Sequence, residues 1–262
     1  MKRILLYSLM GCLLSADSKI WNSHSAYLLP EKRIEIGLFQ PLRYGHSDNL
    51  EYSIYPLWFF VMPNISIKKP IAALGNFNSA MRYSFVYPTP FLNMIAKGGL
   101  GGVISPDFQM PTMIGVSGTW LLSNYVKGVD VTLSTGIDIG IVLGDLDSRS
   151  SIDLPLVYHR LGAYYNNWGM HTGIDLHKNI GNNISILGDC DLRWLPGLDG
   201  DFSLEHKLLI SWKKSDNFRV MTGYKFVMGE YPYGSDMRLL PYLPMAEMWV
   251  PMIELQWARN RK

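Results

Sequence analysis

The stretch Val129–Leu143, VDVTLSTGIDIGIVL, alternates between apolar and small polar residues along its whole length. Successive side chains of a β-strand point to opposite faces, so this pattern predicts one strand with an apolar face and a polar face. The apolar face carries Val129, Val131, Leu133, Ile137, Ile139, Ile141 and Leu143. Most strands have about five or six residues. A much longer strand that sets aliphatic residues against Gly, Ser, Thr and Asp is typical of a barrel that crosses a bacterial outer membrane.

The same alternation recurs along most of the chain. It predicts about twelve strands, within a range of ten to fourteen, near residues 34–38, 50–60, 65–67, 81–87, 114–122, 129–143, 154–165, 168–176, 184–194, 202–213, 218–228 and 253–257. Clusters of Gly, Asn, Asp and Ser separate them, as at 45–49, 179–183 and 214–217. Lipid cannot hydrogen-bond an open strand edge, so we expect an all-β, closed antiparallel transmembrane barrel.

Composition agrees with one membrane-embedded barrel. Aromatic residues make up 13% of the 262 residues, whereas charged residues make up only 18%, below the usual quarter. No run of about 18 apolar residues follows the N-terminus, which excludes a membrane helix. The long connections at 88–111 and 229–251 lack a core of their own, so we expect a single domain over residues 17–262. Two of the 24 basic residues are Lys2 and Arg3, and the remainder balances the 22 acidic ones, so no nucleic-acid partner is indicated.

The first sixteen residues resemble an export signal. Lys2 and Arg3 precede an apolar stretch from Ile4 to Leu14, and Ser15-Ala16 offers a cleavage site. Two alternatives are a lipoprotein signal, in which Cys12 would be acylated, and a buried N-terminal element. If Cys12 leaves with the signal, Cys190 has no partner for an intramolecular disulfide, and its apolar neighbours favour a small lipid-facing residue.

Residues 37–52, GLFQPLRYGHSDNLEY, carry a family resemblance. The segment resembles the strand–turn–strand of uncharacterised bacterial outer-membrane barrel families, which often read F-x-P-L-x-Y-G-L-T-D-x-L-E-L, with His46-Ser47 here in place of Leu-Thr. The resemblance implies barrel architecture, an outer-membrane location and passage through the barrel-assembly machinery, but no substrate. Such chains commonly end on an aromatic residue, whereas this one continues past Trp257 to Lys262.

The expected strand order leaves the orientation open. Twelve strands with both ends in the periplasm would put the long link at 88–111 on the side that normally carries short turns. An additional strand within residues 21–29, or a miscounted strand, would remove this conflict.

We expect no catalytic site, no metal and no cofactor. A phospholipase would need a serine activated by histidine, and the chain has no G-x-S-x-G motif. His171, Asp175 and His177 share one face of a predicted strand, but residues two apart lie nearly 7 Å from one another, so lumen lining is favoured over metal binding. Gly98–Gly102 lacks the Lys-Ser/Thr of a phosphate-binding loop.

The inward charges carry the functional prediction. Acids concentrate in the middle strands and bases in later ones, and the predicted lumen-lining residues are Asp130, Asp138, Asp175, Asp189, Asp191, Arg193, Glu205, Lys207, Lys213, Arg219 and Lys225. Opposed acidic and basic arcs suit a narrow passive channel for small polar solutes. The same charges could equally form ion pairs across a narrow lumen, and such pairs would fill and block a small barrel. The predicted lipid-interface aromatics are Trp58, Trp120, Trp168, Trp194, Trp212 and Trp257.

We therefore expect a porin-like channel in contact with outer-membrane lipids, and not an enzyme. A closed structural barrel whose outer loops bind a partner is the main alternative. A lipid-acting enzyme and a soluble β-sandwich are less favoured.

Overall fold

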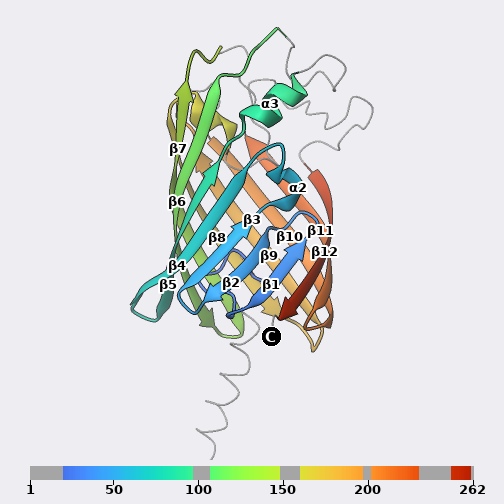
Figure 1. Cartoon of the computed structure of the whole chain (residues 1–262). Coiled ribbons are helices and arrows are strands. Elements are labelled where there is room, and N and C mark those ends of the chain that lie inside the picture. Colours follow the sequence, from blue (N-terminus) through green and yellow to red (C-terminus); the bar gives the residue numbers. More distant parts are fainter. Residues whose placement is uncertain (1–19, 97–106, 148–159, 197–201, 230–248, 261–262) are drawn as a thin grey trace, which may run out of the picture.

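Twelve antiparallel strands form one closed barrel in the computed structural model, which describes residues 20–96, 107–147, 160–196, 202–229 and 249–260 (Figure 1). The strands follow one another around the barrel in chain order, and β1 pairs with β12 to close it. They are β1 (Arg33–Gly37), β2 (Leu42–Ser47), β3 (Leu50–Ile54), β4 (Asn64–Leu74), β5 (Phe77–Val86), β6 (Thr112–Val126), β7 (Val129–Leu143), β8 (Trp168–Asn179), β9 (Ile184–Trp194), β10 (Phe202–Ser215), β11 (Phe218–Gly229) and β12 (Trp249–Asn260). The predicted all-β closed barrel of about twelve strands is confirmed. The predicted signal peptide, with Cys12, lies outside the described residues.

Two errors in the predicted strands cancel in the count. The strand predicted at 154–165 is wrong where it can be compared, because Leu161–Tyr164 form a short 3₁₀ helix, η2; residues 154–159 lie outside the described ranges. The strand β2 is not among the predicted strands, because the turn residues 45–49 overlap three of its six positions. No strand forms within residues 21–29.

With β2 in place, the connections sort by length between the two ends of the barrel. Short turns at 48–49, 75–76, 127–128, 180–183 and 216–217 lie at one end, together with the described beginning and end of the chain; we call this the turn end (Figure 1). The links at 38–41, 55–63, 87–111, 144–167, 195–201 and 230–248 leave the opposite end, the loop end. This arrangement removes the conflict over the link at 88–111.

The two faces of each long strand differ as the alternation predicts. On β7, Asp130, Thr132 and Asp138 are buried toward the lumen, whereas Ile137 and Ile139 are exposed on the outside. The hairpin that joins β6 to β7 turns at Lys127 and Gly128, which both have positive φ, 50° and 86°. Such a two-residue turn matches the twist of its strands and keeps the alternation in register.

Two helices cover part of the loop end. The helix α2 (Pro56–Phe59) and the helix α3 (Thr89–Ile95) pack against a buried apolar cluster, the cap cluster, made of Met62, Val86, Phe91, Leu92, Ala96, Met110, Met113 and Tyr164. None of the helices in the described part of the chain is long and apolar enough to cross a membrane.

Candidate functional site

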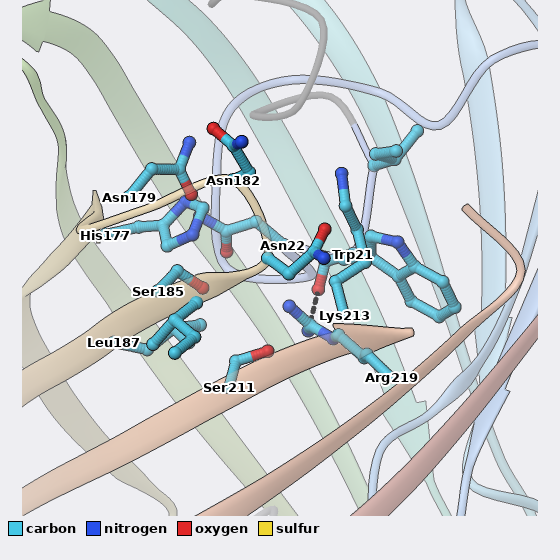
Figure 2. Close-up of a pocket in the computed structure, with 13 residues that line it drawn as sticks. Trp21, Asn22, His177, Asn179, Asn182, Ser185, Leu187, Ser211, Lys213 and Arg219 are labelled. Atoms are coloured by element: carbon cyan, nitrogen blue, oxygen red, sulfur yellow. Dashed lines mark hydrogen bonds between the residues drawn. The ribbon is translucent and has the colours of Figure 1, made fainter. Parts of the chain in front are cut away.

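The segment before β1, residues 20–32, lies inside the barrel lumen near the turn end (Figure 2). We call it the N-terminal segment. Its backbone is held by lumen-facing side chains: the Ala26 N–H donates to Ser123 Oγ at 2.8 Å, and Lys68 Nζ donates to the Tyr27 carbonyl at 2.8 Å. Backbone groups of a non-regular segment need such partners when they are buried. The lumen wall is therefore built to receive this segment.

Trp21 is the tightest point of attachment. Its indole ring lies between the guanidinium groups of Arg33 and Arg219, each 5.2 Å from the ring centroid. Its backbone N–H donates to Glu35 Oε1 at 3.0 Å, and its carbonyl accepts from Arg219 Nη2 at 2.7 Å. Two cation–π contacts and two charge-assisted hydrogen bonds thus fix a single residue.

Residues of the 37–52 motif form the dock for the other end of the segment. The Leu29 N–H donates to Glu51 Oε2 at 2.7 Å, and the Lys32 N–H donates to the Gly45 carbonyl at 2.7 Å. A Cβ at position 45 would lie only 2.6 Å from the Leu29 carbonyl oxygen and 2.8 Å from the Pro30 carbonyl carbon. Glycine is required here because the two backbones approach so closely.

A chain of buried ion pairs links β1 to β4 behind this dock. Arg43 contacts both Glu35 and Glu51 at 2.9 Å, and Lys68 Nζ lies 3.3 Å from Glu51 Oε2. Arg33 Nε donates to Glu35 Oε1 at 2.8 Å. All five side chains are nearly inaccessible, so each charge depends on its partners. Arg33, Glu35, Glu51 and Lys68 each stand next to apolar residues in alternating stretches of the sequence, but the alternation alone does not show that they meet.

A second network lies on the opposite part of the wall. Glu205 pairs with Lys225 at 2.7 Å, with Arg193 at 3.5 Å and with Arg160. Asp189 pairs with Lys207 on the neighbouring strand. Arg160 precedes η2 and had no sequence signal, because it belongs to a loop and not to an alternating strand.

All of the predicted lumen-lining residues lie on the inward side of their strands. Several are buried, and the rest are partly accessible: Asp130, Asp138, Asp189, Glu205, Arg219 and Lys225 form the first group, and Asp175, Asp191, Arg193, Lys207 and Lys213 the second. The acidic and basic groups pair mainly between neighbouring strands, as in Asp189–Lys207 and Glu205–Lys225.

The predicted interface aromatics divide into three groups. Trp168, Trp194, Trp212 and Trp257 are exposed on the outer surface of the barrel. Trp120 is half-buried, and its Nε1 donates to Ser79 Oγ at 2.7 Å. Trp58 does not lie on a strand: Pro56 starts α2, and the Trp58 ring packs on Phe91 of the cap cluster with centroids 5.4 Å apart.

The exposed indoles gather at two heights. Trp168 and Trp194 contact each other edge to face, with centroids 5.3 Å apart, near the loop end, where the unpredicted Trp249 begins β12. Trp212 and Trp257 lie near the turn end. Between them the outer surface is apolar and includes Ile65, Phe85, Val116, Leu133, Ile137, Ile139, Ile174, Leu192, Leu208, Ile210 and Ile253. We call this surface the apolar belt.

Two cavities remain between the N-terminal segment and strands β8–β11. Their volumes are about 400 Å³ and about 420 Å³, counted with the open space at their mouths. The first lies at the turn end, where Trp21 and Asn22 face His177, Asn179 and neighbouring side chains (Figure 2). Its polar lining is formed by amides, hydroxyls, His177, Lys213 and Arg219 without a carboxylate, and Ile20, Trp21, Ile184 and Leu187 add apolar surface. The room available to the centre of a water molecule is about 20 Å³ in the first cavity and about 30 Å³ in the second, so these cavities suit water.

One hydroxyl–imidazole–carboxylate chain occurs in the lumen. His171 Nε2 lies 3.2 Å from Thr119 Oγ1, and His171 Nδ1 lies 3.2 Å from Asp138 Oδ2. Catalysis would require room for a substrate beside the hydroxyl, but Thr119 is 2% exposed. We therefore interpret the chain as lumen packing.

The histidines considered as metal ligands are directed to different partners. His177 Nδ1 lies 3.6 Å from Asp130 Oδ2, away from the contacts of His171. Within the ranges that the structure describes, no three His, Cys, Asp or Glu side chains lie close enough together to hold a metal ion.

His24 makes docking of the N-terminal segment sensitive to pH. Burial lowers the pKa of His24 well below its ordinary value of 6.5, and so do the positive charges of Lys207, Arg82, Lys68 and Arg43. Asp189, which lines the same cavity, is already paired with Lys207. The undocked segment binds a proton more readily than the docked one, so docking should be strongest above about pH 6.5 and weaken as the pH falls below it. Protease protection of residues 20–32 across this range checks the prediction, and His24→Gln should abolish the pH dependence.

No model of a known protein family matches this chain, and no curated protein matches it either.

Proposed function

We propose that this protein is a barrel of the bacterial outer membrane that passes small polar solutes when its N-terminal segment leaves the lumen. The apolar belt carries the membrane part of the proposal. A closed barrel with outward aliphatic residues between two groups of exposed tryptophans satisfies its backbone internally and presents hydrocarbon to lipid. Short turns at the end where β1 begins and β12 ends are typical of outer-membrane barrels.

The lumen supports the transport part. Its wall is polar, and many of its charges pair within the wall, as Asp189 does with Lys207 and Glu205 with Lys225. Those pairs join wall residues to one another and do not depend on the N-terminal segment, so the vacated space would be polar. The groups that hold the segment, such as Ser123 Oγ and Lys68 Nζ, would then face water. The segment itself contains no regular strand or helix, so its release does not require the barrel to unfold. In this proposal the partners are outer-membrane lipids, the barrel-assembly machinery during biogenesis and small polar solutes, and the protein is not an enzyme.

The membrane part is tested by fractionation and gel migration. The protein should leave bacterial envelopes only with detergent, and the folded form should migrate differently before and after heating. Extraction in plain buffer, as a monodisperse protein, would instead favour a soluble barrel.

The transport part is tested by Trp21→Ala in planar lipid bilayers. Each cation–π contact contributes roughly 0.5–2 kcal/mol, so loss of the ring between Arg33 and Arg219 should raise the open fraction about ten-fold or more. Trp212→Ala is the matched control, because it removes an exposed indole that faces away from the lumen. If the Trp21 variant conducts no more than the control, the channel proposal fails. A closed barrel that presents its loops to a partner then becomes the better assignment.

A further inference from the structure

One side of the barrel wall is much lower than the rest. The strands β1, β2 and β3 have 5, 6 and 5 residues, whereas β12, next to β1, has 12. A strand of five residues rises about 17 Å along its axis, and a tilt of about 40° leaves about 13 Å of height. The apolar band of an outer-membrane barrel is about 25 Å tall. The three strands, which we call the low wall, therefore cover about half of it.

Above the low wall, β12 has an edge without a partner strand in the described part of the chain. Strand pairing ends at Gly37 and Gln256, and the Leu38 N–H still donates to the Leu255 carbonyl at 3.2 Å. In an antiparallel pair the N–H and C=O of one residue point to the same side, and this direction alternates along the strand. Ile253 and Pro251 therefore direct their backbone groups toward the same open edge as Leu255.

Residues of β12 reduce the number of unpaired polar groups at this open edge. Pro251 has no N–H to leave unpaired, and proline is found in sheets chiefly at such edges. Glu254 is buried, and its carboxylate accepts hydrogen bonds from the N–H groups of Leu38 and Phe39 at 2.7 and 2.9 Å. The sequence thus removes or satisfies several polar groups where the wall is low.

The two most exposed large apolar side chains among the described residues lie on β12 and on the link that leaves the low wall after β3. Phe60 is 90% exposed and Ile253 is 65% exposed. Leu38 and Phe39, which follow β1, and Leu57 and Phe59 of α2, which follows β3, are exposed as well. Trp58 holds α2 on the cap cluster, so the neighbouring side chains of Leu57, Phe59 and Phe60 point away from the cluster and stay exposed. Residues 55–63, YPLWFFVMP, contain no charge.

We propose that acyl chains of the loop-end leaflet fill the space above the low wall, with Phe60 and its apolar neighbours inserted among them and the bilayer thinner at this side. The proposal rests on the outer-membrane location proposed above. Lipid is the favoured occupant of this space because Phe60 and its apolar neighbours continue the apolar belt from Ile253 of β12 to Ile65 of β4. A pairing strand is disfavoured, because Pro251 offers no donor on the open edge.

The test places nitroxide labels on single cysteines in the full chain, with Cys12 and Cys190 changed to serine. The protein is folded into phosphatidylcholine vesicles, and each label is exposed to oxygen, which concentrates in hydrocarbon, and to a water-soluble nickel chelate. The sites are Phe60→Cys, Ile139→Cys in the apolar belt and Asn182→Cys in the β8–β9 turn. The label at 60 should behave like that at 139, with oxygen the stronger collider and at least a five-fold lower response to the chelate than at 182.

Each other outcome has a definite meaning. If the label at 139 reports hydrocarbon and the label at 60 reports water, the patch is not lipid-inserted and this inference fails, although the outer-membrane proposal stands. If the label at 60 meets neither collider, polypeptide covers it, either this chain or a second copy, and the inference also fails. If the label at 139 reports water, the outer-membrane proposal itself fails.

A pair of charge variants gives a second readout. Phe60→Asp should reduce the yield of heat-modifiable barrel in the same vesicles several-fold, because a carboxylate would have to enter the leaflet. Ile180→Asp is the matched control: Ile180 is also an exposed apolar residue, at 60%, but it lies in a turn at the other end, so its yield should equal that of the wild type. Equal yields for both variants would overturn the inference.

Discussion

Glu51→Ala is expected to lower the free energy of unfolding by about 3–5 kcal/mol, because it leaves Arg43 and Lys68 buried without their shared carboxylate. Glu51 also accepts the Leu29 N–H, so the variant removes one anchor of the N-terminal segment. Urea unfolding of the protein in lipid vesicles, followed by tryptophan fluorescence and by heat-modifiable migration, measures the change.

Two companion variants separate charge from other effects. Glu51→Gln keeps the side-chain volume and should still lower the free energy of unfolding by most of that amount, because the lost charge contributes more than the cavity does. Asp216→Asn removes a carboxylate that is 84% exposed and lies 3.7 Å from Lys213, and it should change stability little. A loss below about 1 kcal/mol for Glu51→Ala would show that Arg43 and Lys68 find water or other partners.

Gly45→Val is expected to expel the N-terminal segment from the lumen. A side chain at position 45 would collide with backbone atoms of Leu29 and Pro30, and backbone cannot rotate away as a side chain does. Chymotrypsin should then cleave after Trp21 and Tyr27 in vesicle-embedded protein, at a rate at least ten-fold above that of the wild type. Bilayer conductance should rise in parallel.

Gly118→Val is the matched control for that experiment. A Cβ at position 118 would meet no atom within 4 Å, so the variant adds the same side chain to another strand without touching the segment. If residues 20–32 are as well protected from chymotrypsin in the Gly45 variant as in the Gly118 variant, Gly45 does not form part of the dock.

The long strands could be predicted because each is constrained on both faces. Along β7, hydrocarbon-facing and lumen-facing positions alternate for the whole length, so periodicity alone defines the element. The short strands carry too few positions for this signal. The apolar run around Trp58-Phe59-Phe60 continued the pattern of β3, but Pro56 and Pro63 bracket it, and Pro56 occupies the first turn of α2, where proline is favoured.

Only part of the candidate site could be predicted from the sequence. Inward charges on long strands, such as Asp189 and Lys207, follow from the alternation. The N-terminal segment does not, because residues 20–32 have no periodicity and their order comes from contacts with distant strands, as between Ala26 and Ser123. The 37–52 motif predicts a tight turn between two strands, yet Gly45 and Glu51 also hold the N-terminal segment that lies against them. A glycine required by a neighbouring backbone cannot be told from a turn glycine until that neighbour is known.

The seam between the first and last strands also sets a condition on synthesis. Arg33 meets Asn260 and Gly37 meets Gln256, so the ring is sealed by residues that leave the ribosome more than two hundred positions apart. A product without β12 would keep two unpaired strand edges, on β1 and β11, and no neighbouring strand could close the ring in its place. Loss of β12 should therefore be as damaging to this protein as loss of a whole hairpin from its middle.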